Sequence, residues 1–278
     1  MTELDEEGEN VPSLREARYS QSLKRGLSIL CHFTPERPVQ GVAEVATDLG
    51  MSSATTHRYL ITLVSLGFVE HCPNRKYRLG LRVTDIGMSA LNSMGLCEHS
   101  HSYLQELRQR STYTVSLAVL DGPEILYVDR VRSFRRGQHQ IDLNIRLGSR
   151  LPAYCTAMGK VLLADLADVE QREVVNPMEL LPRGPNTITA KKSLYAELER
   201  VRDEGMAVND EELSAGLVSI AAPVRSEYRE VVAAVNMAAH TSMISLSQLV
   251  DQLLPHLQST AGQISARLGY RRDDERAE

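Results

Sequence analysis

The spacing of apolar residues in the first third of the chain predicts three short helices followed by a β-hairpin. Apolar positions follow a helical period in "SLKRGLSILCHF", "VAEVATDLG" and "TTHRYLITLVSLG". Only Gly50 and Met51 separate the second helix from the third, which either Ser52 or Ser53 can cap. "FVEHCPNRKYRLG" then predicts two short strands around a Pro-Asn turn. This order is that of a winged helix-turn-helix, which we place at residues 20–80.

A second pattern follows a linker. "LRVTDIGMSALNSMG" predicts a helix at residues 81–95. "TYTVSLAVLDGPEILYVDRV" then alternates on both sides of an Asp-Gly turn, as a hairpin does. "QIDLNIRLGSRLPAY" predicts another strand and a loop, and further strands are predicted in "MAVND", "VSIAAPVRS" and "VVAAVNMAAH". Helices are predicted in "CEHSHSYLQELRQRS", "CTAMGKVLLADL", "SLYAELERVRDEG" and Ile244 to Leu268. Interleaved strands and helices predict an α+β domain at residues 96–269, and an α+β chain overall.

Composition places the chain among ordinary globular proteins. It has 278 residues, 42% of them hydrophobic and 24% charged, which is enough for two domains. No apolar run approaches the ~18 residues of a membrane span, and the acidic start lacks the apolar stretch of a signal peptide. We therefore expect a cytoplasmic protein with no membrane contact and with disordered tails at residues 1–19 and 270–278.

The cysteines and histidines predict neither a metal site nor a cofactor. Four cysteines lie far apart, with no CxxC and no zinc-type spacing: Cys31, Cys72, Cys97 and Cys155. The neighbouring pairs His71/Cys72 and His99/His101 supply too few ligands. We expect reduced thiols, no metal and no cofactor.

Positive charge is concentrated in the predicted winged helix. The whole chain has a net charge of -5, yet residues 20–80 contain seven basic and four acidic residues. The local field, rather than the net charge, decides whether a surface attracts a polyanion. The asymmetry therefore favours nucleic acid as a partner of this segment.

One face of the third helix suits DNA. Thr55, Arg58, Thr62 and Ser65 recur at spacings of three and four, opposite the apolar stripe. Small hydroxyl residues occupy its first turn, where free N–H groups and the helix dipole favour a phosphate. Arg58, one turn further, can reach a phosphate or a guanine edge. The residues predicted to contact DNA are Lys24, Arg25, Ser52, Ser53, Thr55, Thr56, His57, Arg58, Arg75, Lys76 and Arg78.

The alternative is a capped surface helix whose polar face is merely solvated. That interpretation fits any isolated helix of this kind. It leaves unexplained the very short turn before the helix, the basic hairpin after it and the local positive charge in an acidic chain. DNA binding accounts for all three.

Several motifs resemble one known family. "SLKRGLSILCHF…VAEVATDLGMSSATTHRYLITLVSLGFVEHCPNRKYRLG" resembles the DNA-binding domain of the IclR family of bacterial transcription regulators. "LGSRLPAYCTAMGKVLLA" and "VNDEELSAGLVSIAAPV" are similar to that family's two effector-domain motifs. The resemblance runs from about Ser20 to Leu268. "IDLNIRLGSRLPAYCTAMGK" resembles the branch that regulates aromatic-acid breakdown through protocatechuate and the β-ketoadipate pathway.

The resemblance implies that the second domain is a GAF-like sensor of a small molecule. Matching the family's motifs gives the pocket positions Thr156, Asn209, Ser219, Asn236 and Ala238. Some members have an acid in place of Asn209, a Cys in place of Ser219 and hydroxyls at the last two positions. These departures imply a ligand other than the small keto acids that such members bind.

The residues themselves also suggest a carboxylate ligand. "PAYCTAMGK" places Tyr154, Cys155 and Thr156 at the start of a helix, where free N–H groups favour an anion. Arg146 and Arg150 flank the same loop, and either could pair with a carboxylate or form a surface ion pair instead. Tyr154 is expected to line the pocket, although an ordinary half-buried aromatic is the alternative.

An enzymatic function finds little support. "AMGK" fails as a phosphate-binding loop because Tyr154 stands where a glycine is required and Val161 where Ser or Thr is required. No histidine lies at a recognisable offset to activate Cys155. We therefore expect no enzyme and no catalytic residues.

These observations lead to a specific expectation. The chain should bind a near-palindromic double-stranded operator as a homodimer or dimer of dimers. Its effector should be a small carboxylate, such as an aromatic acid or β-ketoadipate. The alternative is a DNA-binding regulator whose second domain serves assembly or partner contact without a small effector.

Overall fold

The structure is a computed structural model that describes residues 20–93, 95–133 and 145–271. The chain forms two compact units, Met1–Ala90 and Leu91–Glu278. The division falls within helix α4, Arg82–Ser93. The tail predicted at residues 1–19 lies outside the described residues, as do residues 272–278.

The first unit contains three helices and a three-stranded antiparallel sheet. The strand order is β1-β3-β2, and Pro73–Arg75 form the turn between the last two strands. The elements are α1 Gln21–His32, β1 Gln40–Gly41, α2 Val42–Asp48, α3 Ser53–Ser65, β2 Val69–Cys72 and β3 Lys76–Leu79. The predicted order of helices and hairpin is therefore present, and β1 is an addition that the sequence pattern did not reveal.

Caps and glycines fix the ends of these helices. The Ser52 hydroxyl accepts from the Thr55 N–H at 3.2 Å and caps α3. Gly50 and Gly67 adopt φ of +61° and +78° after α2 and α3, where a residue with a Cβ would be strained. The buried stripe of α3 then packs against Ile29 of α1 and Tyr77 of the wing. The turn between α2 and α3 is thus set by local sequence signals.

The second unit is built on a six-stranded antiparallel sheet. Its strand order is β6-β5-β4-β9-β8-β7. The strands are β4 Thr114–Asp121, β5 Glu124–Val131, β6 Arg150–Pro152, β7 Ala207–Asp210, β8 Leu217–Arg225 and β9 Val231–His240. Among its described residues, the segment "QIDLNIRLGSRLPAY" contributes the short β6 and the start of the 3-10 turn Ala153–Cys155.

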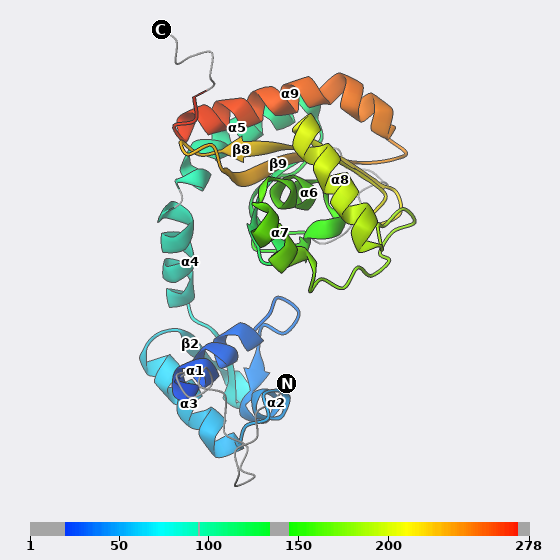
Figure 1. The fold of residues 1–278 in the computed structure, drawn as a ribbon. Coiled ribbons are helices and arrows are strands. Elements are labelled where there is room, and N and C mark those ends of the chain that lie inside the picture. The colour runs from blue at the N-terminus through cyan, green and yellow to red at the C-terminus, as the bar shows by residue number, and fades with distance from the viewer. Residues whose placement is uncertain (1–19, 94, 134–144, 272–278) are drawn as a thin grey trace. The chain divides into compact units, whose positions relative to one another are not determined.

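Helices cover both faces of this sheet (Figure 1). On one face, apolar residues of α5 and α9 pack against alternate strand residues such as Val115 and Leu117. On the other face, α6 packs against the intervening small residues such as Ala118, and α8 packs against α6. The helices are α5 Leu96–Ser111, α6 Ala157–Asp165, α7 Asp168–Val175, α8 Lys191–Glu204 and α9 Leu246–Arg267. The α+β class predicted from the sequence is confirmed, and α7 was not foreseen.

A buried ion-pair network joins α6 to its neighbours. The Lys160 ammonium is 1% exposed and lies 2.5 Å from Glu212 Oε1 and 2.9 Å from Glu197 Oε1. Burial raises the pKa of Glu212 against the opposing effect of Lys160. Burial also acts to raise the pKa of Glu197, but hydrogen bonds from Arg200 and Lys160 bring it below its ordinary value. Lys160 thereby connects α6 to α8 and to the turn after β7.

Candidate functional site

Helix α3 presents an exposed polar face. Ser53, His57 and Arg58 are exposed. Within the described part of the chain, Arg58 has no ion-pair partner. The Thr62 hydroxyl donates to the carbonyl of Arg58 at 3.0 Å, so it is already bonded to its own helix. The side chain best placed to contact an outside partner is that of Arg58.

The structure corrects one residue of this face. Thr56 is fully buried, and its hydroxyl has no hydrogen-bond partner in the part of the chain that the structure describes. It lies four residues before Leu60, so the helical period places it on the apolar stripe. Ser52 and Thr55 are instead hydrogen-bonded to each other, with Oγ to Oγ1 at 2.8 Å. Thr56 therefore supports the helix and is not available to DNA.

The wing carries the predicted cations, but two of them are already paired. Lys76 lies 3.4 Å from Glu44, and Arg78 donates two hydrogen bonds to Glu70 at 2.8 and 2.9 Å. Arg75, at the exposed turn with φ of +57°, makes no ion pair with a described residue. Among the wing cations, Arg75 is the one with its whole charge available for a phosphate.

The first helix adds two exposed cations. Lys24 and Arg25 lie in the first half of α1, and neither pairs with a described carboxylate. Both are therefore able to contribute phosphate contacts of the salt-dependent kind.

Arg75→Ala should change the salt dependence of DNA binding more than Lys76→Ala. Each lost phosphate contact lowers the slope of log K against log salt by about 1. Glu44 already neutralises part of the Lys76 charge. Removing the Lys76 side chain should therefore lower the slope by less than removing that of Arg75. Fluorescence anisotropy with a random duplex across a salt series measures both slopes. Equal slopes for the two variants would contradict this assignment.

The predicted effector residues of the strands lie on one face of the second sheet. Asn209 pairs with Ser219, and Ser219 pairs with Ala238, so the three form one row across β7, β8 and β9. Asn236 stands two residues before Ala238 and therefore points to the same side. That side faces α6, because Ala234 of the same strand packs in the α6 cluster. The structure thus brings these residues together on the sheet.

Thr156 and Asn209 have structural hydrogen bonds of their own. The Thr156 hydroxyl caps α6 by accepting from the Gly159 N–H at 3.1 Å. Asn209 Nδ2 donates to the Cys155 carbonyl at 2.6 Å, which connects β7 to the turn before α6. A Cβ at Gly159 would collide with the backbone of Ala153, so this turn and α6 are in direct backbone contact. The local geometry of this loop is therefore fixed.

The remaining predicted effector residues do not join the polar row on the sheet face. Burial raises the pKa of the Cys155 thiol to about 11, so it is not a nucleophile at neutral pH. Arg150 lies 2.5 Å from Asp121 and 3.7 Å from Glu124 at an exposed position, as a surface ion pair. Arg146 is also exposed. Neither arginine is buried in the sheet face.

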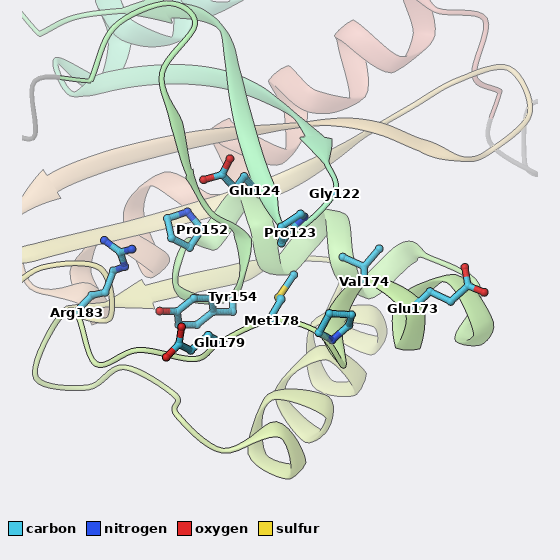
Figure 2. A pocket seen from close by; sticks show the side chains of 11 residues that line it. Gly122, Pro123, Glu124, Pro152, Tyr154, Glu173, Val174, Met178, Glu179 and Arg183 are labelled. Carbon is cyan, nitrogen blue, oxygen red and sulfur yellow. The ribbon is translucent and has the colours of Figure 1, made fainter. Parts of the chain in front are cut away.

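Tyr154 lines a separate cavity of about 450 Å³ (Figure 2). Its hydroxyl donates to the Leu181 carbonyl at 2.7 Å. Figure 2 shows the Tyr154 ring near Met178, with Arg183 and Glu173 at opposite ends of the labelled group. The other predicted effector residues do not line this cavity. It is therefore a second candidate ligand site beside the sheet face.

Sequence reasoning missed two polar residues of the sheet face. Ser116 pairs with both Arg130 on β5 and Asn236 on β9, so all three lie in one row. Ser116 is buried and Arg130 is half-buried. A single arginine in an alternating strand gives no sequence signal, because the strand register alone decides which side it faces.

Two further searches concern metals and membranes. Within the described residues, no group of three or more His, Cys, Asp or Glu side chains is arranged to hold a metal ion. None of the helices in this part of the chain combines the length and apolarity needed to cross a bilayer.

Two family models match the chain. The model described as "IclR helix-turn-helix domain" matches residues 22–73, and "Bacterial transcriptional regulator IclR C-terminal" matches residues 88–266. Together they cover α1 to β2 of the first unit and nearly the whole second unit.

Individual relatives agree with the family models. The chain is 32% identical to the Pca regulon regulatory protein of Pseudomonas putida, over 90% of this chain and 84% of that protein. It is 33% identical to the p-hydroxybenzoate hydroxylase transcriptional activator of Acinetobacter baylyi, over 90% and 93% of the two chains.

A solved structure shares the whole architecture. It is an IclR homolog from Microbacterium hydrocarbonoxydans complexed with 4-hydroxybenzoate, 25% identical, with a TM-score of 0.78 over 89% of this chain and 99% of that one. The relatives are transcription regulators and not enzymes, in agreement with the expectation from the sequence. The chain belongs to the IclR family of bacterial transcription regulators.

Proposed function

We propose that this regulator controls genes of aromatic-acid catabolism in response to a small carboxylate effector. The names of two relatives, the Pca regulon regulator and the p-hydroxybenzoate hydroxylase activator, support the pathway. The 4-hydroxybenzoate bound to the Microbacterium homolog supports the ligand class. The buried polar row on the α6 face of the second sheet supports a site for it in this chain. Because its proposed partner is DNA, we expect the protein to act in the cytoplasm.

DNA recognition is proposed to rest on α3. The observation that carries this proposal is the exposed Arg58 on a capped helix, without a described carboxylate to neutralise it. A recognition helix of this kind enters the major groove with its N-terminal residues near the base edges. Lys24, Arg25 and Arg75 then supply phosphate contacts that fix the position of the helix without reading sequence.

The operator is proposed to be near-palindromic, with the protein bound as a homodimer or dimer of dimers. Leu23 and Leu27 of α1 are 63% and 51% exposed, although they follow the helical period. Apolar side chains exposed at helical spacing support a surface that a second copy covers. Two-fold symmetry of the protein then requires two-fold half-sites in the DNA.

The effector is proposed to act by shifting a conformational equilibrium. A ligand can do so only if it binds the DNA-competent and incompetent arrangements with different affinity. A tenfold difference supplies about 1.4 kcal/mol. Helix α4, within which the two units divide, is the segment through which such a shift would pass.

The test uses purified full-length protein and a promoter fragment from upstream of its own gene. We expect binding at low ionic strength, and a change in operator affinity of about fivefold or more with an aromatic acid. Thermal shift with 4-hydroxybenzoate, protocatechuate, β-ketoadipate and pyruvate identifies the ligand class, since a specific ligand stabilises by mass action. Absence of DNA binding would refute the regulator. Binding without any ligand response would favour a second domain that serves assembly alone.

A further inference from the structure

Arg130 is a half-buried cation on the α6 face of the second sheet without a described carboxylate partner. Its Nη1 lies 3.5 Å from Ser116 Oγ, and its Cζ lies 5.8 Å from the centre of the Tyr127 ring. Its Nε is buried and has no hydrogen-bond partner among the described residues. Lys160 and Arg225, which are also withdrawn from solvent, both face carboxylates. Among the described residues, Arg130 therefore lacks the counter-charge that Lys160 and Arg225 have.

The ligand-free state of Arg130 is energetically unfavourable. A half-buried cation without an opposite charge loses hydration that one hydroxyl and an aromatic ring replace only in part. Burial lowers the pKa of Arg130, and the neighbouring positive charge of Arg132 acts in the same direction. An incoming anion would supply both the missing charge and an acceptor for Nε.

An unpartnered acceptor lies in the same row. Asn236 is 6% exposed, and no described residue donates a hydrogen bond to its buried Oδ1. Ser116 separates it from Arg130, since β5, β4 and β9 are consecutive strands of the sheet. The two backbones are therefore about 10 Å apart, at roughly 4.8 Å for each strand spacing. A donor without an acceptor and an acceptor without a donor face the same side over this span.

We propose that this row binds a hydroxy-substituted monocarboxylic acid, with its carboxylate on Arg130 and Ser116 and its hydroxyl donating to Asn236. The inference rests on the proposed effector role of this domain and assigns the anchor to Arg130 rather than to Arg146 or Arg150. One guanidinium and one hydroxyl match a single carboxylate in charge and in donors. Arg150 is already neutralised by Asp121 and Glu124.

The test varies the ligand and the protein together. Isothermal titration of the full-length protein uses 3- and 4-hydroxybenzoate and protocatechuate, with benzoate and 4-hydroxybenzamide lacking one group each. Arg130→Gln should weaken the binding of the tightest hydroxy acid about 30-fold or more, and it should abolish the preference for that acid over 4-hydroxybenzamide. Asn236→Leu should abolish the preference over benzoate. The matched control Arg150→Gln should bind like the wild type.

A purely structural role would give other results. Because the cation is uncompensated without ligand, Arg130→Gln should melt at the same temperature as the wild type or higher. A lower melting temperature, reproduced by Asp142→Asn, would assign Arg130 to an ion pair with that acid, which lies outside the described residues, and would overturn the proposal. Filling the Figure 2 cavity with Met178→Trp should leave ligand binding intact. If Met178→Trp abolished ligand binding and Arg130→Gln did not, the ligand site would be that cavity.

Operator binding separates this inference from the broader function. Suppose that the wild type binds the operator and responds to a hydroxy acid, and that Arg130→Gln responds equally. This result would refute only the role of Arg130 in holding the carboxylate. A wild type that binds the operator but none of the acids refutes the carboxylate effector as well. Failure to bind promoter DNA refutes the regulator itself.

Discussion

Replacing Lys160 by Met should lower the free energy of unfolding of the second unit by about 3–5 kcal/mol. The ammonium is 1% exposed and is the shared partner of Glu197 and Glu212. Removing it leaves two carboxylates close together and poorly hydrated. Glu197 keeps its contacts with Arg200, but Glu212 has no other ion pair among the described groups, and its Oε2 already lacks a hydrogen-bond partner. Urea unfolding followed by far-UV circular dichroism measures the loss.

Two variants make the result specific. Lys192→Met removes an exposed lysine from α8 and should change stability by less than about 0.5 kcal/mol. Adding Glu212→Gln to Lys160→Met should recover part of the loss, because the uncompensated charge disappears with it. A loss below about 1 kcal/mol for Lys160→Met, or no recovery in the double variant, would mean that the network does not hold α6 in place.

Replacing Arg58 by Ala should weaken operator binding by about 5- to 150-fold, which corresponds to roughly 1–3 kcal/mol. The reason is that α3 presents this guanidinium outward, with no described carboxylate competing for it. The loss should be larger on the operator than on random duplex, because a base contact discriminates among sequences. Thermal stability and ligand binding should be unchanged, since the side chain is exposed.

Thr56→Val is the matched control on the same helix. Thr56 is buried and its hydroxyl is unpartnered, so an apolar side chain of the same shape should preserve or improve stability and leave DNA binding unaltered. If Thr56→Val weakened operator binding while Arg58→Ala did not, the outward face of α3 would be assigned incorrectly. Anisotropy titrations with both duplexes decide between the two outcomes.

Local signals in the sequence were sufficient to place the helices and the hairpin of the first unit. The Ser52 cap, Gly50, Gly67 and the period of Leu60 and Leu63 place α3 to within a residue. The prediction for Thr56 is wrong because the helical period turns this residue inward, away from the other hydroxyl residues of the same turn. Strand β1 is two residues long and exists only through its pairing with β3, which no local pattern encodes.

In the second unit, the sequence shows the alternation of apolar and polar residues in β4, β5, β8 and β9. It does not show to which side of the sheet a single polar side chain points. Arg130 faces α6 partly because a bulge between Leu117 and Ala118 shifts the register of β4 against β5. Arg150 is an ion-pair residue because that hairpin brings Asp121 and Glu124 beside β6. Both facts depend on pairing across the sheet, so the sequence could suggest an arginine for the ligand without identifying which one.

The missing side chain of Gly159 has a mechanical consequence. With no room for even a methyl group between α6 and the backbone of Ala153, neither can slide without carrying the other. The very next residue, Lys160, fastens the same helix to α8. We therefore expect a displacement of the turn that contains Tyr154 to move α6 and α8 with it, although Ala153 and Glu197 are 44 residues apart (197 - 153) in the chain.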